Sequence, residues 1–239
     1  MSGSTGNVGF VISDLHIFSY ASLYERYLPM LEAAASTYKI VVLNGDTFDF
    51  KRSRYANNRE TSHAAIEWLG SLCVRNPETT FYFLIGNHDC NYSFVDELTL
   101  LEKRCANLHV SPDVLQIGSS LFVHGDVCDL PRGSLDIDGL RARYSSQERS
   151  VGSILFAQVV TYLRLNVVEY IRHRNSDLAS RILYYLKKKY PEKLSATERI
   201  FFGHTHVPFT DLMVDGIKFS NTGSAIRGLK MNALEFPLP

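Results

Sequence analysis

The stretch TFYFLIGNHD, residues 80–89, runs from aromatic and β-branched residues into a short polar cluster. The apolar part is typical of a buried strand, and the Gly-Asn-His-Asp that follows predicts a loop at the end of that strand. Loops at strand ends are where α/β proteins gather their functional residues. We therefore expect Asn87 and His88 to belong to a site at the edge of a sheet.

Two stretches of the same kind precede it, VGFVISDLH at residues 8–16 and KIVVLNGDTFD at residues 39–49. Each again passes from a strand-like apolar run to acidic or histidine residues. Apolar positions at helical spacing over residues 22–37, and a further helix at about 60–74, separate the strands. This β-α-β-α-β alternation predicts a largely parallel inner sheet.

The second half of the chain is dominated by short β runs, so a second sheet is expected. Asp215-Gly216 predicts a hairpin turn between the last two of them. The expected strands are residues 108–110, 114–117, 121–124, 199–202, 209–214 and 217–220.

Composition limits the class of protein. The chain has 239 residues, 45% of them hydrophobic, enough for one well-packed domain over residues 1–239. Its 25 basic and 25 acidic residues cancel, so charge suggests no nucleic-acid partner. The four cysteines form no CxxC pair, no secretory leader pattern is present, and no apolar run reaches the roughly 18 residues of a membrane span. These features predict a cytoplasmic enzyme.

A helical insertion is expected at about residues 129–197. Residues 151–171 and 177–189 carry apolar positions at helical spacing. Residues 164–199 include nine Lys or Arg but only four Asp or Glu, so this segment is basic. The segment is then either a solvated basic face or a cap that recruits an anionic or amphipathic substrate. Its basic amphipathic pattern is compatible with peripheral membrane contact, but a buried cap explains the same pattern without a membrane.

The clustered side chains are the ligand types of a hard or borderline metal. Carboxylates, an amide and imidazoles, with no cysteine, suit Mn, Fe, Zn or Mg. Asp14 and His16 are two apart, which on an extended strand end would direct both at one metal. His204 and His206 share that spacing and serve either one metal or two neighbouring ones. With Asp46 as a bridging carboxylate, two divalent ions have seven candidate ligands, Asp14, His16, Asp46, Asn87, His124, His204 and His206.

These motifs, D-x-H, G-D-x-x-D, G-N-H-D, H and G-H-x-H in this order over residues 14–206, resemble those of the calcineurin-like metallophosphoesterase family. The resemblance implies a four-layer α/β/β/α sandwich of two mixed sheets with a dinuclear site, Mn being the favoured metal. It also implies that His88 acts as general acid, oriented by Asp89, on a small phosphorylated substrate. The implied ligands are Asp14, His16 and His206 for one ion, Asn87, His124 and His204 for the other, and Asp46 for both.

Three further features resemble one branch of the family, the UDP-2,3-diacylglucosamine diphosphatases of lipid A synthesis. They are GDTFDF at residues 45–50, HGDVCD at residues 124–129 and the helical insertion before residues 203–206. This resemblance implies cleavage of a pyrophosphate bond in an amphipathic lipid precursor. The bacterial diphosphatases, however, have Arg where this chain has His88. A phosphodiesterase or phosphomonoesterase of the same fold is the alternative.

Two smaller features complete the motif set. Asn221-Thr222-Gly223-Ser224 looks like the family's closing Asn-Pro-Gly-Ser turn with Thr in place of Pro. We expect Asp126 and Asp129 either to contact the substrate, to support the metal ligands from outside, or to serve turn and cap roles.

Overall fold

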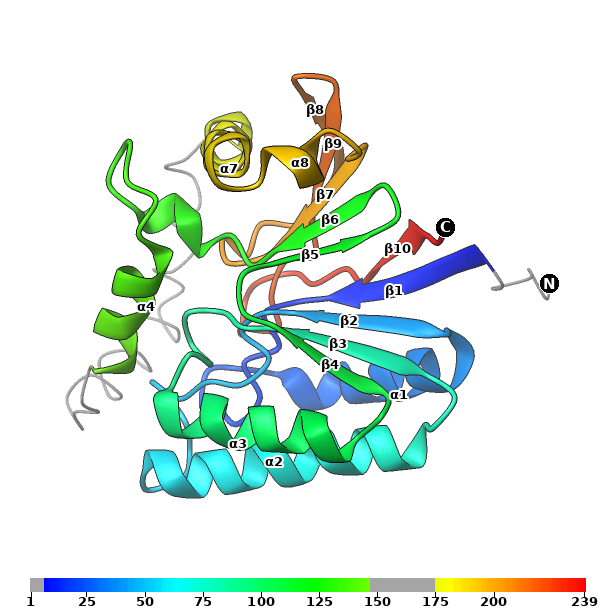
Figure 1. Ribbon diagram of the computed structural model, residues 1–239. Coiled ribbons are helices and arrows are strands. Elements are labelled where there is room, and N and C mark those ends of the chain that lie inside the picture. The colour runs from blue at the N-terminus through cyan, green and yellow to red at the C-terminus, as the bar shows by residue number, and fades with distance from the viewer. Residues whose placement is uncertain (1–6, 147–174) are drawn as a thin grey trace.

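The computed structural model describes residues 7–146 and 175–239, in which two five-stranded sheets face each other (Figure 1). The first sheet has the order β10-β1-β2-β3-β4, and the second has the order β5-β6-β7-β9-β8. The helix predicted at 151–171 lies outside the described residues. The first sheet consists of β1 (Val8–Ile12), β2 (Ile40–Asn44), β3 (Thr80–Leu84), β4 (Leu108–Ser111) and β10 (Leu234–Pro237).

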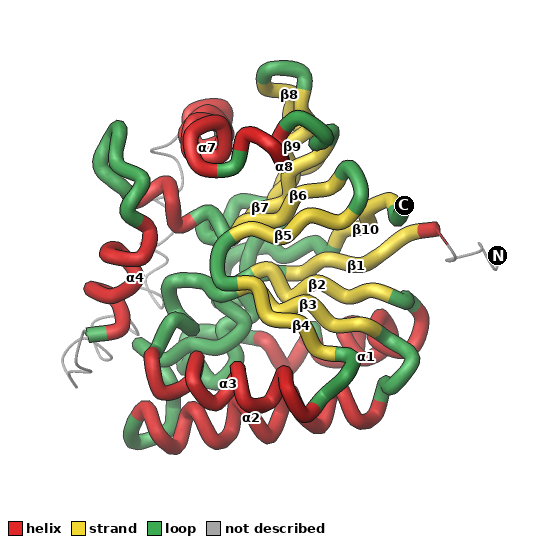
Figure 2. Tube along the Cα trace, viewed as in Figure 1, coloured by secondary structure: helices red, strands yellow, loops and turns green. Residues whose placement is uncertain are grey.

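The predicted β-α-β-α-β unit is confirmed. β1, β2, β3 and β4 are mutually parallel, and only β10 runs antiparallel, against β1. Three helices cover the outer face of this sheet, as Figure 2 shows most clearly. They are α1 (Leu28–Thr37), α2 (Asn58–Arg75) and α3 (Tyr92–Arg104).

The helix expected over residues 22–37 is divided. A 3-10 turn, η2 (Tyr24–Arg26), precedes α1, and Pro29 lies in the first turn of α1. Proline fits there because its missing N–H would have no partner within the helix. Asn57 begins α2 by accepting a hydrogen bond from the Glu60 N–H, and its own amide donates to the Glu60 carboxylate.

The second sheet is mixed. β6 and β7 are parallel, as are β7 and β9, whereas β5 and β8 pair antiparallel with their neighbours. The hairpin predicted at Asp215-Gly216 joins β8 and β9, with both residues at positive φ. The strands are β5 (Val114–Ile117), β6 (Ser120–Val123), β7 (Arg199–Phe202), β8 (Phe209–Val214) and β9 (Ile217–Asn221).

The described part of the insertion begins with η3 (Asp126–Asp129) and α4 (Ile137–Ser145) and resumes with α7 (Asn175–Lys189) and α8 (Pro191–Leu194). The helix predicted at 177–189 is thus confirmed as α7, which lies over the outer face of the second sheet and forms the fourth layer (Figure 1). Ile182 and Leu186 of α7 are fully buried in one cluster with the second sheet.

The two sheets meet through a largely apolar layer. Val42, Phe122 and Phe201 are buried there, with Phe122 and Phe201 stacked at a centroid distance of 5.2 Å. Each such side chain contributes on the order of 1.5–3 kcal/mol by leaving water. Asn44, at the end of β2, donates to the carbonyls of Val123 and Phe201 across the gap. The sheets are therefore fixed against each other at the edge where β1, β2, β3, β6 and β7 all end.

Candidate metal centre

All the motif residues lie on loops that leave this one edge of the two sheets. Asp14 follows β1, Asp46 follows β2, His88 follows β3, His124 follows β6 and His204 follows β7. Asp14, Asp46 and His124 are 0–1% exposed. The motif residues therefore lie at strand ends, as predicted, and both sheets contribute to the site.

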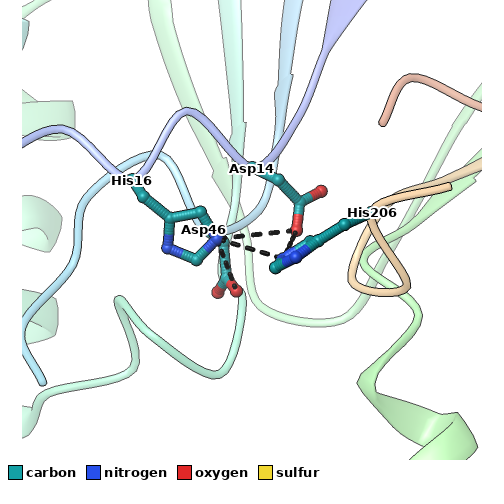
Figure 3. A group of neighbouring side chains, drawn as sticks. All are labelled: Asp14, His16, Asp46 and His206. Carbon is teal, nitrogen blue, oxygen red and sulfur yellow. Dashed lines mark hydrogen bonds and ion pairs between the residues drawn. The ribbon is translucent and has the colours of Figure 1, made fainter. Parts of the chain in front are cut away.

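One group of ligand atoms converges around His16 and His206 (Figure 3). The two Nε2 atoms lie 3.2 Å apart, and His206 Nε2 lies 3.1 Å from Asp14 Oδ1. His16 Nε2 also lies 3.8 Å from Asp46 Oδ2. Nitrogen and oxygen atoms from three loops thus point at a common centre, as the ligands of one cation do.

A second group forms on the other side of Asp46. His124 Nε2 lies 3.1 Å from Asn87 Oδ1, and His204 Nδ1 lies 2.9 Å from that same oxygen. His124 Nε2 is also 3.3 Å from Asp46 Oδ1. Asp46, His124 and His204 form a candidate metal group of their own, to which Asn87 adds a fourth donor.

Asp46 belongs to both groups, with Oδ2 toward His16 and Oδ1 toward His124. This is the arrangement of a bridging carboxylate. His204 and His206 share a loop but belong to different groups, His206 to the first and His204 to the second. The geometry therefore favours the alternative in which each histidine serves a different metal.

The ligand residues adopt an unusual backbone conformation. Asp14, His16, Asp46, His204 and His206 all have φ between 47° and 62°. We expected an extended strand end to carry Asp14 and His16, and this backbone conformation was wrong, because β1 ends at Ile12 and the chain then turns through left-handed residues. The two side chains nevertheless reach one candidate metal group, as expected. Left-handed conformations cost of order 1 kcal/mol or more each for non-glycine residues and are concentrated at functional sites.

Glycines in the motifs make room for the ligands. A Cβ on Gly86 would collide with the Asp46 carboxylate, and a Cβ on Gly203 would collide with the carboxylate of Asp14. Gly86 and Gly203 are therefore required by the close approach of a ligand from another loop.

Buried carboxylates and buried histidines lie next to each other in the candidate site. Burial lowers the pKa of His124, but the adjacent Asp46 carboxylate outweighs burial and raises this pKa to about 10. Burial would raise the pKa of Asp46, but the neighbouring histidines hold it well below its usual range. The carboxylates thus favour positive charge at the histidine nitrogens, which is what divalent cations would supply. The donor set of Asp, Asn and His fits such ions.

His88 and Asp89 are placed differently from each other. Burial lowers the pKa of His88 to about 4, and its Nδ1 lies 2.9 Å from Asp49 Oδ1. Asp89 turns away, since its two oxygens accept the N–H groups of Gly86 and Thr47 at 2.5 and 2.8 Å. Asp89 therefore ties two motif loops together, and the carboxylate in contact with His88 is Asp49.

Other side chains hold the ligands from outside. Asp129 Oδ2 lies 3.1 Å from His204 Nε2 and accepts a hydrogen bond from Tyr144 at 2.9 Å. Asp126 forms a buried two-point ion pair with Arg141, at 2.7 and 3.0 Å. Of the roles considered, support of a metal ligand is the one that the contacts favour for Asp129, whereas Asp126 contacts Arg141 of the insertion helix α4.

The turn at residues 221–224 supports the first group. Asn221 donates to the Gly203 carbonyl at 2.8 Å and to the Thr205 hydroxyl at 3.0 Å, which holds the loop that carries His204 and His206. The Thr222 hydroxyl lies 2.6 Å from Ser13 Oγ, which in turn donates to Asp14. The threonine thus adds a hydrogen bond that proline in this position would lack.

A model of the family described as calcineurin-like phosphoesterase matches residues 10–208. The chain belongs to this family, and it is accordingly a metal-dependent phosphoesterase with a candidate site for two divalent ions. The observed sheets and flanking helices confirm the predicted fold class. A search of curated proteins found no match.

Solved structures similar to this chain are distant. A dimetal phosphatase from Danio rerio is 12% identical, with a TM-score of 0.49 and coverage of 97% of this chain and 99% of that chain. The phosphopantetheinyl hydrolase PptH from Mycobacterium tuberculosis is 15% identical, with a TM-score of 0.42 and coverage of 90% and 89%. A predicted phosphoesterase from Streptococcus pneumoniae is 14% identical, with a TM-score of 0.41 and coverage of 96% and 83%. None of them assigns a substrate to this chain.

Sequence reasoning missed three residues of the site. Asp49 is the last residue of the G-D-x-x-D motif, but the motif did not indicate that this carboxylate contacts His88. Arg141 and Tyr144 had none, because they lie in the insertion outside every motif.

Proposed function

We propose that this enzyme hydrolyses a pyrophosphate bond in a nucleotide-linked substrate such as UDP-2,3-diacylglucosamine. The observation that carries the hydrolytic part is the Asp46 carboxylate, whose two oxygens face two separate ligand groups. Two adjacent ions polarise a phosphoryl group and activate water near neutral pH. We propose Mn²⁺ for both ions.

The ligand roles follow from the two groups. Asp14, His16 and His206 would hold one ion, and Asn87, His124 and His204 the other, with Asp46 shared. His124 Nδ1 lies 3.3 Å from the carbonyl of Asn44, which can only accept a hydrogen bond. This contact directs the Nε2 atom of His124 at the centre of the site.

His88 is the proposed general acid, with Asp49 in place of Asp89 as the residue that orients it. Asp49 Oδ1 also accepts the N–H groups of Lys51 and Arg52, at 3.0 and 2.8 Å, so the carboxylate itself is fixed. Because the pKa of His88 is lowered to about 4, the free ring is neutral at pH 7. A phosphate anion beside the ring favours its charged form, which can then donate a proton to the leaving oxygen.

Support for an amphipathic substrate comes from a cavity of about 570 Å³ between α7 and the loop after η3. Its lining combines apolar residues such as Leu130 and Tyr184 with Arg132 and Arg181. This size and mixture suit a ligand with both apolar and phosphate parts. α7 lines this cavity with Ser180, Arg181 and Tyr184 among others, while the rest of its apolar face is buried against the second sheet.

Cytoplasmic location and peripheral membrane contact are part of the same proposal. In residues 7–146 and 175–239 no helix has the length and apolar character needed to cross a membrane.

The test is hydrolysis of UDP-2,3-diacylglucosamine by purified, Mn-loaded protein, with UMP and orthophosphate measured separately. A bis-p-nitrophenyl phosphate reaction runs beside it. UMP release supports the proposal. Turnover of the diester without UMP release refutes the pyrophosphate substrate and favours the alternative, a phosphodiesterase or phosphomonoesterase.

A further inference from the structure

A small cleft beside His88 is lined in part by the Lys51 ammonium, a group that the reaction chemistry above does not use. It is lined by Lys51, Asn87, His88, Asn91 and Tyr144, among others. Asn87 and His88 belong to the candidate site, so the cleft opens directly from it. Whatever occupies the cleft is therefore in contact with the group that meets the leaving oxygen.

Lys51 is fixed rather than freely solvated. Its Nζ lies 3.7 Å from the centre of the Tyr144 ring, a cation–π contact between the loop after β2 and helix α4. The residue is only partly exposed, and burial lowers its pKa. In the part of the chain that the structure describes, no carboxylate forms an ion pair with its ammonium, in contrast to Lys187 and Lys189, which pair with Asp215 and Asp113.

The position of Tyr144 is itself determined by the site. Its hydroxyl donates to Asp129, which contacts the metal-group residue His204. Ser145, next in the helix, accepts a hydrogen bond from the Tyr92 N–H at the start of α3. Helix α4 lies beside the strand ends (Figure 1). Its Tyr144 forms part of the cleft wall and contacts Lys51.

We propose that Lys51 binds the second, non-transferred phosphate of a diphosphate substrate on the leaving-group side of His88. The inference rests on the proposed function, since it takes His88 as the group that faces the leaving oxygen. It deepens that function, because it names a substrate class. A cation beside the leaving group stabilises an anionic phosphate and offers nothing comparable to an uncharged alcohol. Lys51 would then be the residue that selects phosphoanhydrides over simple esters.

The experiment compares the binding of α,β-methylene-UDP and UMP to the Mn-loaded protein by isothermal titration calorimetry. The first ligand has a second phosphate and a non-hydrolysable bridge, and the second ligand lacks both. We expect the wild-type protein to bind α,β-methylene-UDP roughly 10- to 100-fold more tightly than UMP, the range of one charge-assisted hydrogen bond.

Lys51→Met, which keeps the chain length but removes the charge, should abolish most of this preference, and Lys51→Arg should restore part of it. Lys187→Met is the matched control, because Lys187 is an exposed lysine on α7 paired with Asp215, away from the site. A wild-type protein without the preference, or a Lys51→Met protein that keeps it, would overturn the assignment. This experiment measures binding without turnover. A negative result for Lys51 is therefore distinguishable from a negative result for the proposed function, which is measured as UMP release.

Discussion

Removing the Arg141 guanidinium should destabilise the protein strongly. Arg141 pairs with Asp126 through two bonds, and their side chains are 9% and 0% exposed. Arg141→Met leaves Asp126 buried without its partner, which costs about 3–5 kcal/mol. At roughly 2–4 °C per kcal/mol for a chain of this size, the Tm should fall by about 6–20 °C. Differential scanning calorimetry of the metal-free protein measures this directly.

The matched control is Arg199→Met. Arg199 also pairs with an aspartate, Asp211, at 3.1 Å, but these side chains are 33% and 55% exposed. An exposed pair contributes about 0–1 kcal/mol, so this variant should change the Tm by only a few degrees. Equal Tm values for the two variants would refute the reasoning that burial makes the Arg141 pair important.

The loss should also depend on pH. The Arg141 guanidinium, outweighing burial, lowers the pKa of Asp126 in the folded protein. A carboxyl group with a depressed folded pKa stabilises the fold above its unfolded pKa of about 3.9 and ceases to do so as pH falls through the folded value. In Arg141→Met, burial disfavours the charged form of Asp126, opposed only by the charges of nearby histidines, and protonation of the carboxylate relieves this cost. The difference in Tm between wild type and variant should therefore be constant near pH 7 and narrow toward pH 4.

The remaining predictions concern the metal centre and the proton donor. Asp46→Asn should abolish hydrolysis and reduce the bound metal measured by inductively coupled plasma spectrometry at both sites, and full activity with two ions retained would exclude the bridging role. His88→Ala should lower kcat roughly 10²–10⁴-fold on substrates with poor leaving groups, and far less on p-nitrophenyl esters that need no protonation; equal losses on both would argue against a general acid. Asp49→Asn should show the same dependence on leaving group with a smaller loss, and a loss independent of the leaving group would assign Asp49 to structure alone.

Much of the fold was predictable because its signals are local. Apolar runs located every strand except β10, and helical spacing located α2 and α7. Residues 108–110, expected with the second sheet, instead form β4 of the first sheet. α3 and β10 were missed. β10 is a short edge strand that contains Glu235 and Pro237, so it lacks the strand pattern and is specified by pairing with the distant β1.

The site was less predictable where it depends on the path of the backbone. Motif order identified the ligand candidates, but residue spacing could not show which carboxylate contacts His88. Asp89 is adjacent in sequence, yet the tight loop turns its carboxylate back to the Gly86 N–H. Asp49 is 39 residues away in sequence and 2.9 Å away in space. Arg141 likewise reaches Asp126 only because α4 packs on the strand ends.

The left-handed ligand residues place folding and catalysis in conflict at single positions. Asp14, His16, Asp46, His204 and His206 adopt a conformation in which glycine is the least strained residue. Selection for stability alone would favour glycine at these positions, whereas activity requires the side chains. A design method that optimises only folding energy would therefore tend to replace these ligands with glycine. Positions where such a method prefers glycine but the natural sequence has Asp or His would then identify residues kept for metal binding at a cost in stability.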